Sequence, residues 1–172
     1  MKLHIIGMAG SGKTTLARWA AAEFGIPAHD LDYVVYGDAG ERPEAEIVAR
    51  LEEIRAGRGW VTEGAYRNAW LHPLLADSDS IVWLDVPLRT CLYRIVRRHV
   101  IAEMSRTNPH PGWRRLVWFL NYTRRIAHCA DIESRELLAP HRDKVTRCQS
   151  SADMRAVRTE LKRLASPRLG TG

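Results

Sequence analysis

The chain has few cysteines, and their placement excludes two kinds of site. Only three of its 172 residues are cysteine, and they lie far apart, at positions 91, 129 and 148. An odd number of cysteines without a CxxC pair indicates neither a disulfide framework nor a zinc site. His128 precedes Cys129, but adjacent residues of a helix point in different directions, so we expect no metal there.

The sequence also lacks long hydrophobic runs. No apolar stretch approaches the roughly 20 residues that a membrane-spanning helix needs. The opening residues MKLHII are too short and too interrupted for a signal peptide. We therefore expect a cytoplasmic protein with no membrane partner. Its 45% hydrophobic and 27% charged residues are typical of one globular domain with a sizeable core.

The charge balance is basic, with a formal net charge of +6 and a sequence pI of about 9.6. Such a charge can neutralise a nucleic-acid backbone. It can equally gather around the phosphates of one small nucleotide. Net charge alone does not decide between these two partners.

Apolar patterning and turn residues predict strands that alternate with helices. Strands are expected at residues 3–6, 26–30, 60–63, 80–86 and 144–148, and helices at 14–24, 43–56, 87–105, 113–127 and 152–164. One more helix, separate from 113–127 and running through residue 138, is also considered. This alternation predicts an α/β fold with a five-stranded parallel sheet and helices on both faces. We expect one domain over residues 1–165 and a flexible tail over 166–172.

Polar residues cluster where the predicted strands end. The glycine-rich segment 7–14 follows the first strand, Asp30 and Asp32 follow the second, and Glu63 ends the third. Open parallel sheets bind ligands at the carboxyl ends of their strands, so these residues are expected to converge on one site. Asp85, in the fourth strand, is expected to be structural.

Residues 7–14, GMAGSGKT, match the phosphate-binding motif G-x-x-x-x-G-K-[ST] at every fixed position. Glycines let backbone amides curl around an anion, and the following helix directs its positive end at the phosphates. Lys13 would reach the β- and γ-phosphates, and Thr14 would offer its hydroxyl to Mg²⁺. The residues expected to hold ATP or GTP are Gly7, Gly10, Ser11, Gly12, Lys13, Thr14 and Thr15.

Further segments resemble a known family. The stretch LDVP at 84–87, followed by RIVRR at 94–98, is similar to the corresponding part of adenylate kinases. With the phosphate loop, it resembles the nucleoside-monophosphate-kinase branch of P-loop proteins. The segments DLD at 30–32, WVTEGAYR at 60–67 and CQSS at 148–151 resemble small adenylate-kinase-like proteins known as DNA topology modulation proteins.

The resemblance implies a lid at about residues 99–123 that closes over ATP. Arg94 and Arg98 are four residues apart and share one helix face. By the resemblance, Arg94 would lie over the nucleotide base and Arg98 would reach the phosphates, with both acting in catalysis. Arg97 is expected to point elsewhere, and Arg124 or Arg125 to return to the site.

This lid is short and lacks the four metal-binding cysteines of the long-lid adenylate kinases. It contains Trp113, Trp118, Phe119 and Tyr122 instead. At helical spacing, such residues are more often core or partner contacts than base-stacking platforms. We therefore expect them to be buried.

The acceptor of the phosphoryl group needs its own pocket. Asp30 and Asp32 alternate along a predicted extended segment, so they can point the same way. The resemblance implies that the Asp30 and Asp32 pair holds the acceptor hydroxyl and the water shell of the metal. It also implies that Glu63 orients Mg²⁺-bound water and that Arg67 grips an anion on the acceptor. Glu63 replaces an aspartate of the family and is one methylene longer.

Two functions are consistent with these residues. The favoured one is an ATP-dependent kinase of a nucleotide or another small anionic acceptor, in which catalysis is positioning and charge neutralisation. The alternative is a regulatory protein that uses the phosphate loop as a nucleotide switch and acts on nucleic acid. The alternative rests on the net charge and on the arginine pairs 97–98, 114–115 and 124–125, although no DNA-reading module is visible.

Overall fold

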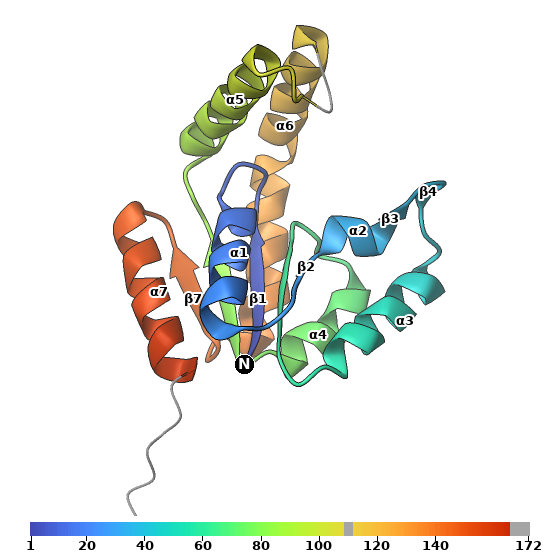
Figure 1. The fold of residues 1–172 in the computed structure, drawn as a ribbon, viewed down its shortest axis with the longest axis vertical. Helices are drawn as coiled ribbons and strands as arrows, with labels where there is room; N and C mark the ends of the chain where they lie inside the picture. Colours follow the sequence, from blue (N-terminus) through green and yellow to red (C-terminus); the bar gives the residue numbers. More distant parts are fainter. Residues whose placement is uncertain (109–111, 166–172) are drawn as a thin grey trace, which may run out of the picture.

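A computed structural model describes residues 1–108 and 112–165. Its main sheet has five parallel strands in the order β2-β5-β1-β6-β7 (Figure 1). The first strand is therefore central, with β5 on one side and β6 on the other. The predicted α/β fold with a five-stranded parallel sheet is confirmed.

The elements follow one another along the chain with short connections. They are β1 (Lys2–Gly7), α1 (Lys13–Phe24), β2 (Ala28–Asp30), α2 (Leu31–Val35), β3 (Tyr36–Gly37), β4 (Gly40–Glu41), α3 (Glu44–Arg55), β5 (Trp60–Gly64), η1 (Ala69–Leu71), α4 (His72–Asp77), β6 (Ser80–Leu84), α5 (Leu88–Met104), α6 (Trp113–Leu138), η2 (Ala139–His141), β7 (Val145–Cys148) and α7 (Ser151–Ala165). The strands β3 and β4 form a separate antiparallel hairpin.

Helices cover both faces of the sheet, because alternate strand residues are apolar on each side. On one face, buried residues of α1 and α7 pack against Leu3, Ile5 and Val82. On the other, buried residues of α2, α3, α4 and α6 pack against Ile6 and Trp60. These two cores make the three-layer arrangement expected of a P-loop protein, and they fix β1 and its loop in the middle.

Helix α6 corrects one expectation. A helix over 113–127 with a separate one after it was considered, but α6 is a single helix of 26 residues. No proline or glycine occurs between Trp113 and Leu138 to interrupt it. The break expected between α5 and α6 falls partly on residues 109–111, and the expected tail falls on residues 166–172. Both segments lie outside the described residues.

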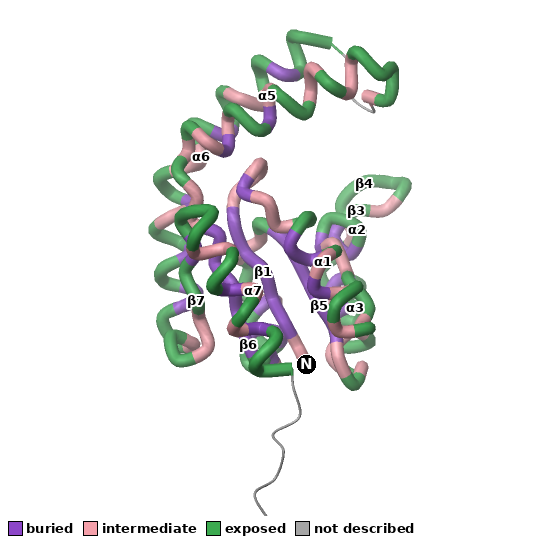
Figure 2. The backbone as a smooth tube through the Cα atoms, turned by 60° about the vertical axis from the view of Figure 1, so that its left-hand side comes forward, coloured by how far each residue is buried: buried purple, intermediate pink, exposed green. Residues whose placement is uncertain are grey.

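The C-terminal part of α5 and the N-terminal part of α6 extend past the body of the molecule and form a two-helix arm (Figure 1). Most of this arm is exposed (Figure 2). Trp113 is 60% exposed, Trp118 66% and Tyr122 47%, so the expectation that the lid aromatics are buried is wrong for these three. The arm is too thin to enclose them, because only one face of each helix packs against its neighbour. Within residues 1–108 and 112–165, no helix is long and apolar enough to cross a membrane.

Candidate active site

The phosphate loop lies between the central strand and α1, at the carboxyl edge of the sheet. Gly10 has a φ of 77° and Gly12 a φ of 106°, a left-handed backbone that favours glycine. A Cβ atom on Gly10 would also lie 2.5 Å from the carbonyl oxygen of Cys91. The loop is therefore pressed against the start of α5, and Gly10 is needed both for its backbone and for space.

Lys13 and Thr14 open α1 at this edge. Thr14 Oγ1 donates a 2.5 Å hydrogen bond to Glu63 Oε1, so the hydroxyl and the carboxylate meet where the motif places a metal ion. Lys13 Nζ donates to the carbonyl of Met8 at 3.2 Å. Of the other loop residues, Ser11 is buried, and its Oγ has no hydrogen-bond partner among the residues that the structure describes. Thr15 is exposed on the first turn of α1.

Burial shifts the pKa values of Lys13 and Glu63. Desolvation lowers the pKa of Lys13, while Glu63 and the two aspartates oppose that shift. Desolvation likewise raises the pKa of Glu63, against the hydrogen bond from Thr14 and the charge of Lys13. A bound anion beside Lys13 would offset the cost of burying its charge, as a phosphate site requires.

The two aspartates are arranged differently from the expectation. Asp30 ends β2, but Asp32 lies in the first turn of α2, so the extended segment predicted for both is wrong. Asp30 Oδ1 accepts a hydrogen bond from the Asp32 backbone N at 2.9 Å and caps the helix. Asp32 Oδ1 instead accepts from the Tyr66 hydroxyl at 2.8 Å. Tyr66 was not foreseen as a site residue, since nothing in its sequence setting indicates this bond.

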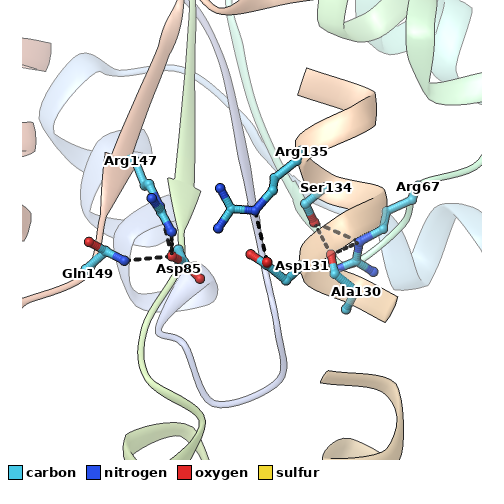
Figure 3. Close-up of polar contacts among 8 residues, drawn as sticks. All are labelled: Arg67, Asp85, Ala130, Asp131, Ser134, Arg135, Arg147 and Gln149. Carbon is cyan, nitrogen blue, oxygen red and sulfur yellow. Dashed lines mark hydrogen bonds and ion pairs between the residues drawn. The ribbon is translucent and has the colours of Figure 1, made fainter. Parts of the chain in front are cut away.

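Arg67 is held by α6 rather than left to face a ligand alone (Figure 3). Its Nε donates to the carbonyl of Ala130 at 3.0 Å and to Ser134 Oγ at 2.8 Å, and Nη1 donates to the carbonyl of Ala65 at 2.6 Å. Two of these bonds tie the loop after β5 to α6, and the third lies within that loop. The expected grip of Arg67 on an acceptor anion stays a prediction. Arg67 nevertheless lines the cleft described below.

The arginines of α5 gather at one hollow of about 280 Å³, which Arg94, Arg97 and Arg98 line together. The expectation that Arg97 points elsewhere is wrong, because it lies three residues after Arg94 and so shares its face. Arg94 Nη1 also donates to the carbonyl of Ser11 at 2.9 Å. The arm is thus linked to the phosphate loop. Arg94 further lines a second hollow, of about 230 Å³, with Gln149 and Ser150.

A cleft of about 1230 Å³ joins the phosphate loop to the acceptor side. Its walls come from the phosphate loop, α2 and the β3–β4 hairpin, the loop after β5, and α6. The lining residues include Lys13, Asp30, Asp32, Tyr33, Tyr36, Arg42, Tyr66, Arg67, Phe119 and Tyr122. Neither Arg124 nor Arg125 is among the described residues that line it. The hairpin residues were not foreseen, because two-residue strands leave no clear pattern.

Asp85 lies just past β6 and has a structural role, in line with the expectation. Its carboxylate accepts hydrogen bonds from Arg147 Nε at 2.8 Å and from Gln149 Nε2 at 2.8 Å (Figure 3). These bonds fasten the end of β6 to the end of β7. They do not reach the cleft, since Asp85 is not one of its lining residues.

Comparisons with known proteins find kinases among the proteins similar to this chain. No family model matches the chain. A shikimate kinase from Symbiobacterium thermophilum is 32% identical over 110 residues, which are 52% of this chain and 60% of that protein. A cytidylate kinase from Methanoregula boonei is 25% identical over 61% of this chain and 65% of that protein. The matches thus span less than two thirds of each of these curated relatives.

The fold has a close counterpart among solved structures. The shikimate kinase from Acinetobacter baumannii in complex with shikimate superposes with a TM-score of 0.60 and 19% sequence identity, covering 98% of this chain and 95% of that one. This likeness confirms the fold. The chain is therefore an α/β P-loop protein whose sequence relatives and structural neighbour are kinases.

Proposed function

We propose that this protein is an ATP-dependent kinase that transfers the γ-phosphoryl group to a hydroxyl of a small acceptor. One observation carries the proposal: Lys13 of the phosphate loop and Asp32 of α2 line the same cleft. A nucleotide site and a carboxylate able to accept a proton are thereby brought together. The relatives named above are kinases of small acceptors, which supports the same reaction class.

The nucleotide side of the proposal uses the phosphate loop and the arm. The residues of the loop would hold the triphosphate, with Lys13 on its outer phosphates. Mg²⁺ would neutralise charge on the phosphates. Thr14 and Glu63 supply the hydroxyl and carboxylate oxygens that this ion prefers. Among residues 1–108 and 112–165, no group of three metal-ligating side chains is present, and Mg²⁺ held partly by phosphates needs none.

The lid arginines would act when the arm moves toward the loop. Arg94 already contacts carbonyl oxygens of the phosphate loop. Arg94 and Arg98 together line the hollow on α5 described above. Closure would bring positive charge to the transferred group and exclude water. These arginine roles belong to the proposal, as does the cytoplasmic location.

On the acceptor side, Asp32 would accept the proton of the attacking hydroxyl. The bond from Tyr66 orients its carboxylate, and a positioned base contributes roughly 10²–10⁴ in rate. Arg67 and Arg42 border the same cleft, so a nucleotide or another small anionic acceptor fits its charges. Arg67 would hold the acceptor loop in place rather than bind the anion alone.

The alternative of a nucleotide-switched regulatory protein keeps one supporting observation, the exposed basic arm. The narrower resemblance to DNA topology modulation proteins stays a prediction. A switch protein would bind ATP without passing its phosphate to an acceptor. The two functions therefore differ in whether a phosphorylated product forms.

The test is ADP release on mixing the protein with ATP and panels of nucleosides, nucleoside monophosphates, sugars and hydroxy acids. We expect one panel to raise ADP release above background hydrolysis. In the Asp32→Asn variant, the acceptor-dependent rate of ADP release should be lower by about 10²-fold or more, while ATP binds as tightly as to wild type. Asp143→Asn is the matched control, since Asp143 is exposed at the opposite end of the sheet. If no acceptor raises ADP release, the kinase proposal is refuted.

A further inference from the structure

One exposed stripe on α6 extends beyond the kinase site described so far. Arg115, Trp118, Tyr122 and Arg125 are spaced by three, four and three residues, so they lie on one helix face. All four are exposed. The rings of Trp118 and Tyr122 stack with an interplanar angle of 7° and centroids 5.5 Å apart. The stripe therefore presents a flat aromatic platform between two guanidinium groups.

The stripe begins where the acceptor cleft ends. Tyr122 lines that cleft together with Lys13 and Asp32, and Trp118 continues the platform up the arm. The far side of the cleft carries Tyr33 and Tyr36 from α2 and the β3–β4 hairpin. A flat group can thus lie in the cleft among aromatic rings, with further flat groups leading out along the stripe.

The charge of the arm fits a polyanion. Nine arginines and one glutamate fall between Leu88 and Arg125, while the whole chain has a net charge of only +6. The remainder of the chain is therefore net acidic. The single acid, Glu103, already accepts hydrogen bonds from Asn108 and from the Gly112 backbone N. So dense a positive charge opposes pairing of two arms from separate copies of this chain.

Single-stranded nucleic acid combines what this surface offers to bind. Its phosphates suit the arginines, and its bases stack on exposed aromatic rings. We propose that the acceptor is the 5′-terminal hydroxyl of a single-stranded nucleic acid. The terminal nucleotide occupies the cleft and the next ones follow the stripe. This inference rests on the proposed kinase function and puts the end of a polymer in place of its small acceptor.

The chemical step is ordinary phosphoryl transfer. The 5′ oxygen forms a bond to the γ-phosphorus of ATP, and the bond from that phosphorus to the bridging oxygen of ADP breaks. The hydroxyl proton passes to the Asp32 carboxylate, and ADP leaves. A 5′ hydroxyl is primary and projects from the sugar ring, so it reaches the in-line position more readily than the ring-bound 3′ hydroxyl.

The test measures transfer of label from γ-labelled ATP to three acceptors: thymidine, oligothymidylate with a free 5′ hydroxyl, and oligothymidylate already phosphorylated at that end. We expect the 5′-hydroxyl strand to exceed thymidine at least tenfold in kcat/KM, and the blocked strand to accept nothing. Trp118→Ala should lower kcat/KM for the strand by about five- to 150-fold, the effect of losing one stacked base. Its kcat/KM for thymidine should not change.

Tyr93→Ala is the matched control, because Tyr93 on α5 is 66% exposed, as is Trp118, but lies outside the stripe. Equal losses in both variants, or labelling of the blocked strand, would overturn the inference. Labelling of a small acceptor but not of the 5′-hydroxyl strand would also overturn it, while leaving the kinase proposal intact. Failure of every acceptor to raise ADP release would instead overturn the kinase proposal and, with it, this inference.

Discussion

The fully buried His4 makes stability depend on pH. It lies on β1, two strand positions before Ile6 and close to the phosphate loop. Its Nδ1 is 2.9 Å from Thr62 Oγ1 on the neighbouring strand, and Nε2 has no partner among the described residues. Burial, and secondarily the charge of Lys13, lowers the pKa of His4 from 6.5 to about 3.

The lowered pKa sets both the sign and the size of the effect. Below pH 6.5 the unfolded chain takes up a proton at His4, while the folded protein does not until about pH 3. Stability from this group is therefore complete above pH 6.5 and is lost as the pH falls between these values. One pKa unit corresponds to about 1.4 kcal/mol, so the loss at pH 5 is about 2 kcal/mol.

The assay is urea unfolding of wild type and His4→Asn at pH 7.5 and pH 5. Asparagine keeps a polar group toward Thr62 but does not titrate. The free energy of unfolding should fall by about 2 kcal/mol more in wild type than in the variant over this range. His128→Asn, at an exposed position, should behave as wild type. Equal pH dependence in wild type and His4→Asn would refute the reasoning.

Four substitutions test other parts of the site. Gly10→Ala should destabilise the protein by about 1–3 kcal/mol and abolish ATP binding, measured by thermal unfolding and calorimetry, because its Cβ meets a carbonyl at 2.5 Å and its φ is positive. Arg67→Ala should destabilise by about 2–4 kcal/mol in urea and raise the acceptor KM, because it removes three hydrogen bonds; an unchanged stability would return it to anion binding alone. Lys13→Ala should lose most ATP affinity in calorimetry but keep its circular dichroism spectrum. Arg98→Ala should lower kcat about 10- to 100-fold with little change in ATP affinity, and equal kinetics to wild type would remove it from catalysis.

The sheet and the phosphate loop could be predicted because their signals are local. Buried parallel strands are continuous apolar runs, as at 81–84, and the motif at 7–14 fixes a strand, a loop and a helix together. The parallel direction of the strands then follows from the alternation of strands and helices. The convergence of Glu63 and the phosphate loop on one site could be predicted for the same reason, since adjacent parallel strands end at one edge.

The cleft and the arm depend on contacts between distant residues. Helix α2, which carries Asp32, is too short to show a helical periodicity in the sequence, and the Asp30 cap stabilises it. The sequence therefore predicted an extended segment there. Arg67 bonds to two residues of α6 that lie far along the chain: Ala130 is 63 positions away and Ser134 is 67 positions away. No local sequence pattern predicts such contacts. Trp118 shows a helical spacing typical of core, but its burial depends on whether a third element covers the arm.

The central claim is that one cleft joins an ATP site to an acceptor site. The most direct measurement is the appearance of label from γ-labelled ATP in an acceptor product, with wild type, Lys13→Ala and Asp32→Asn compared at saturating ATP. The account predicts labelled product with wild type. Asp32→Asn should form product at a rate lower by about 10²-fold or more despite normal ATP binding, and Lys13→Ala should form none above background. Labelled inorganic phosphate as the sole product of wild type with every acceptor, at a rate unaffected by Asp32→Asn, would contradict it.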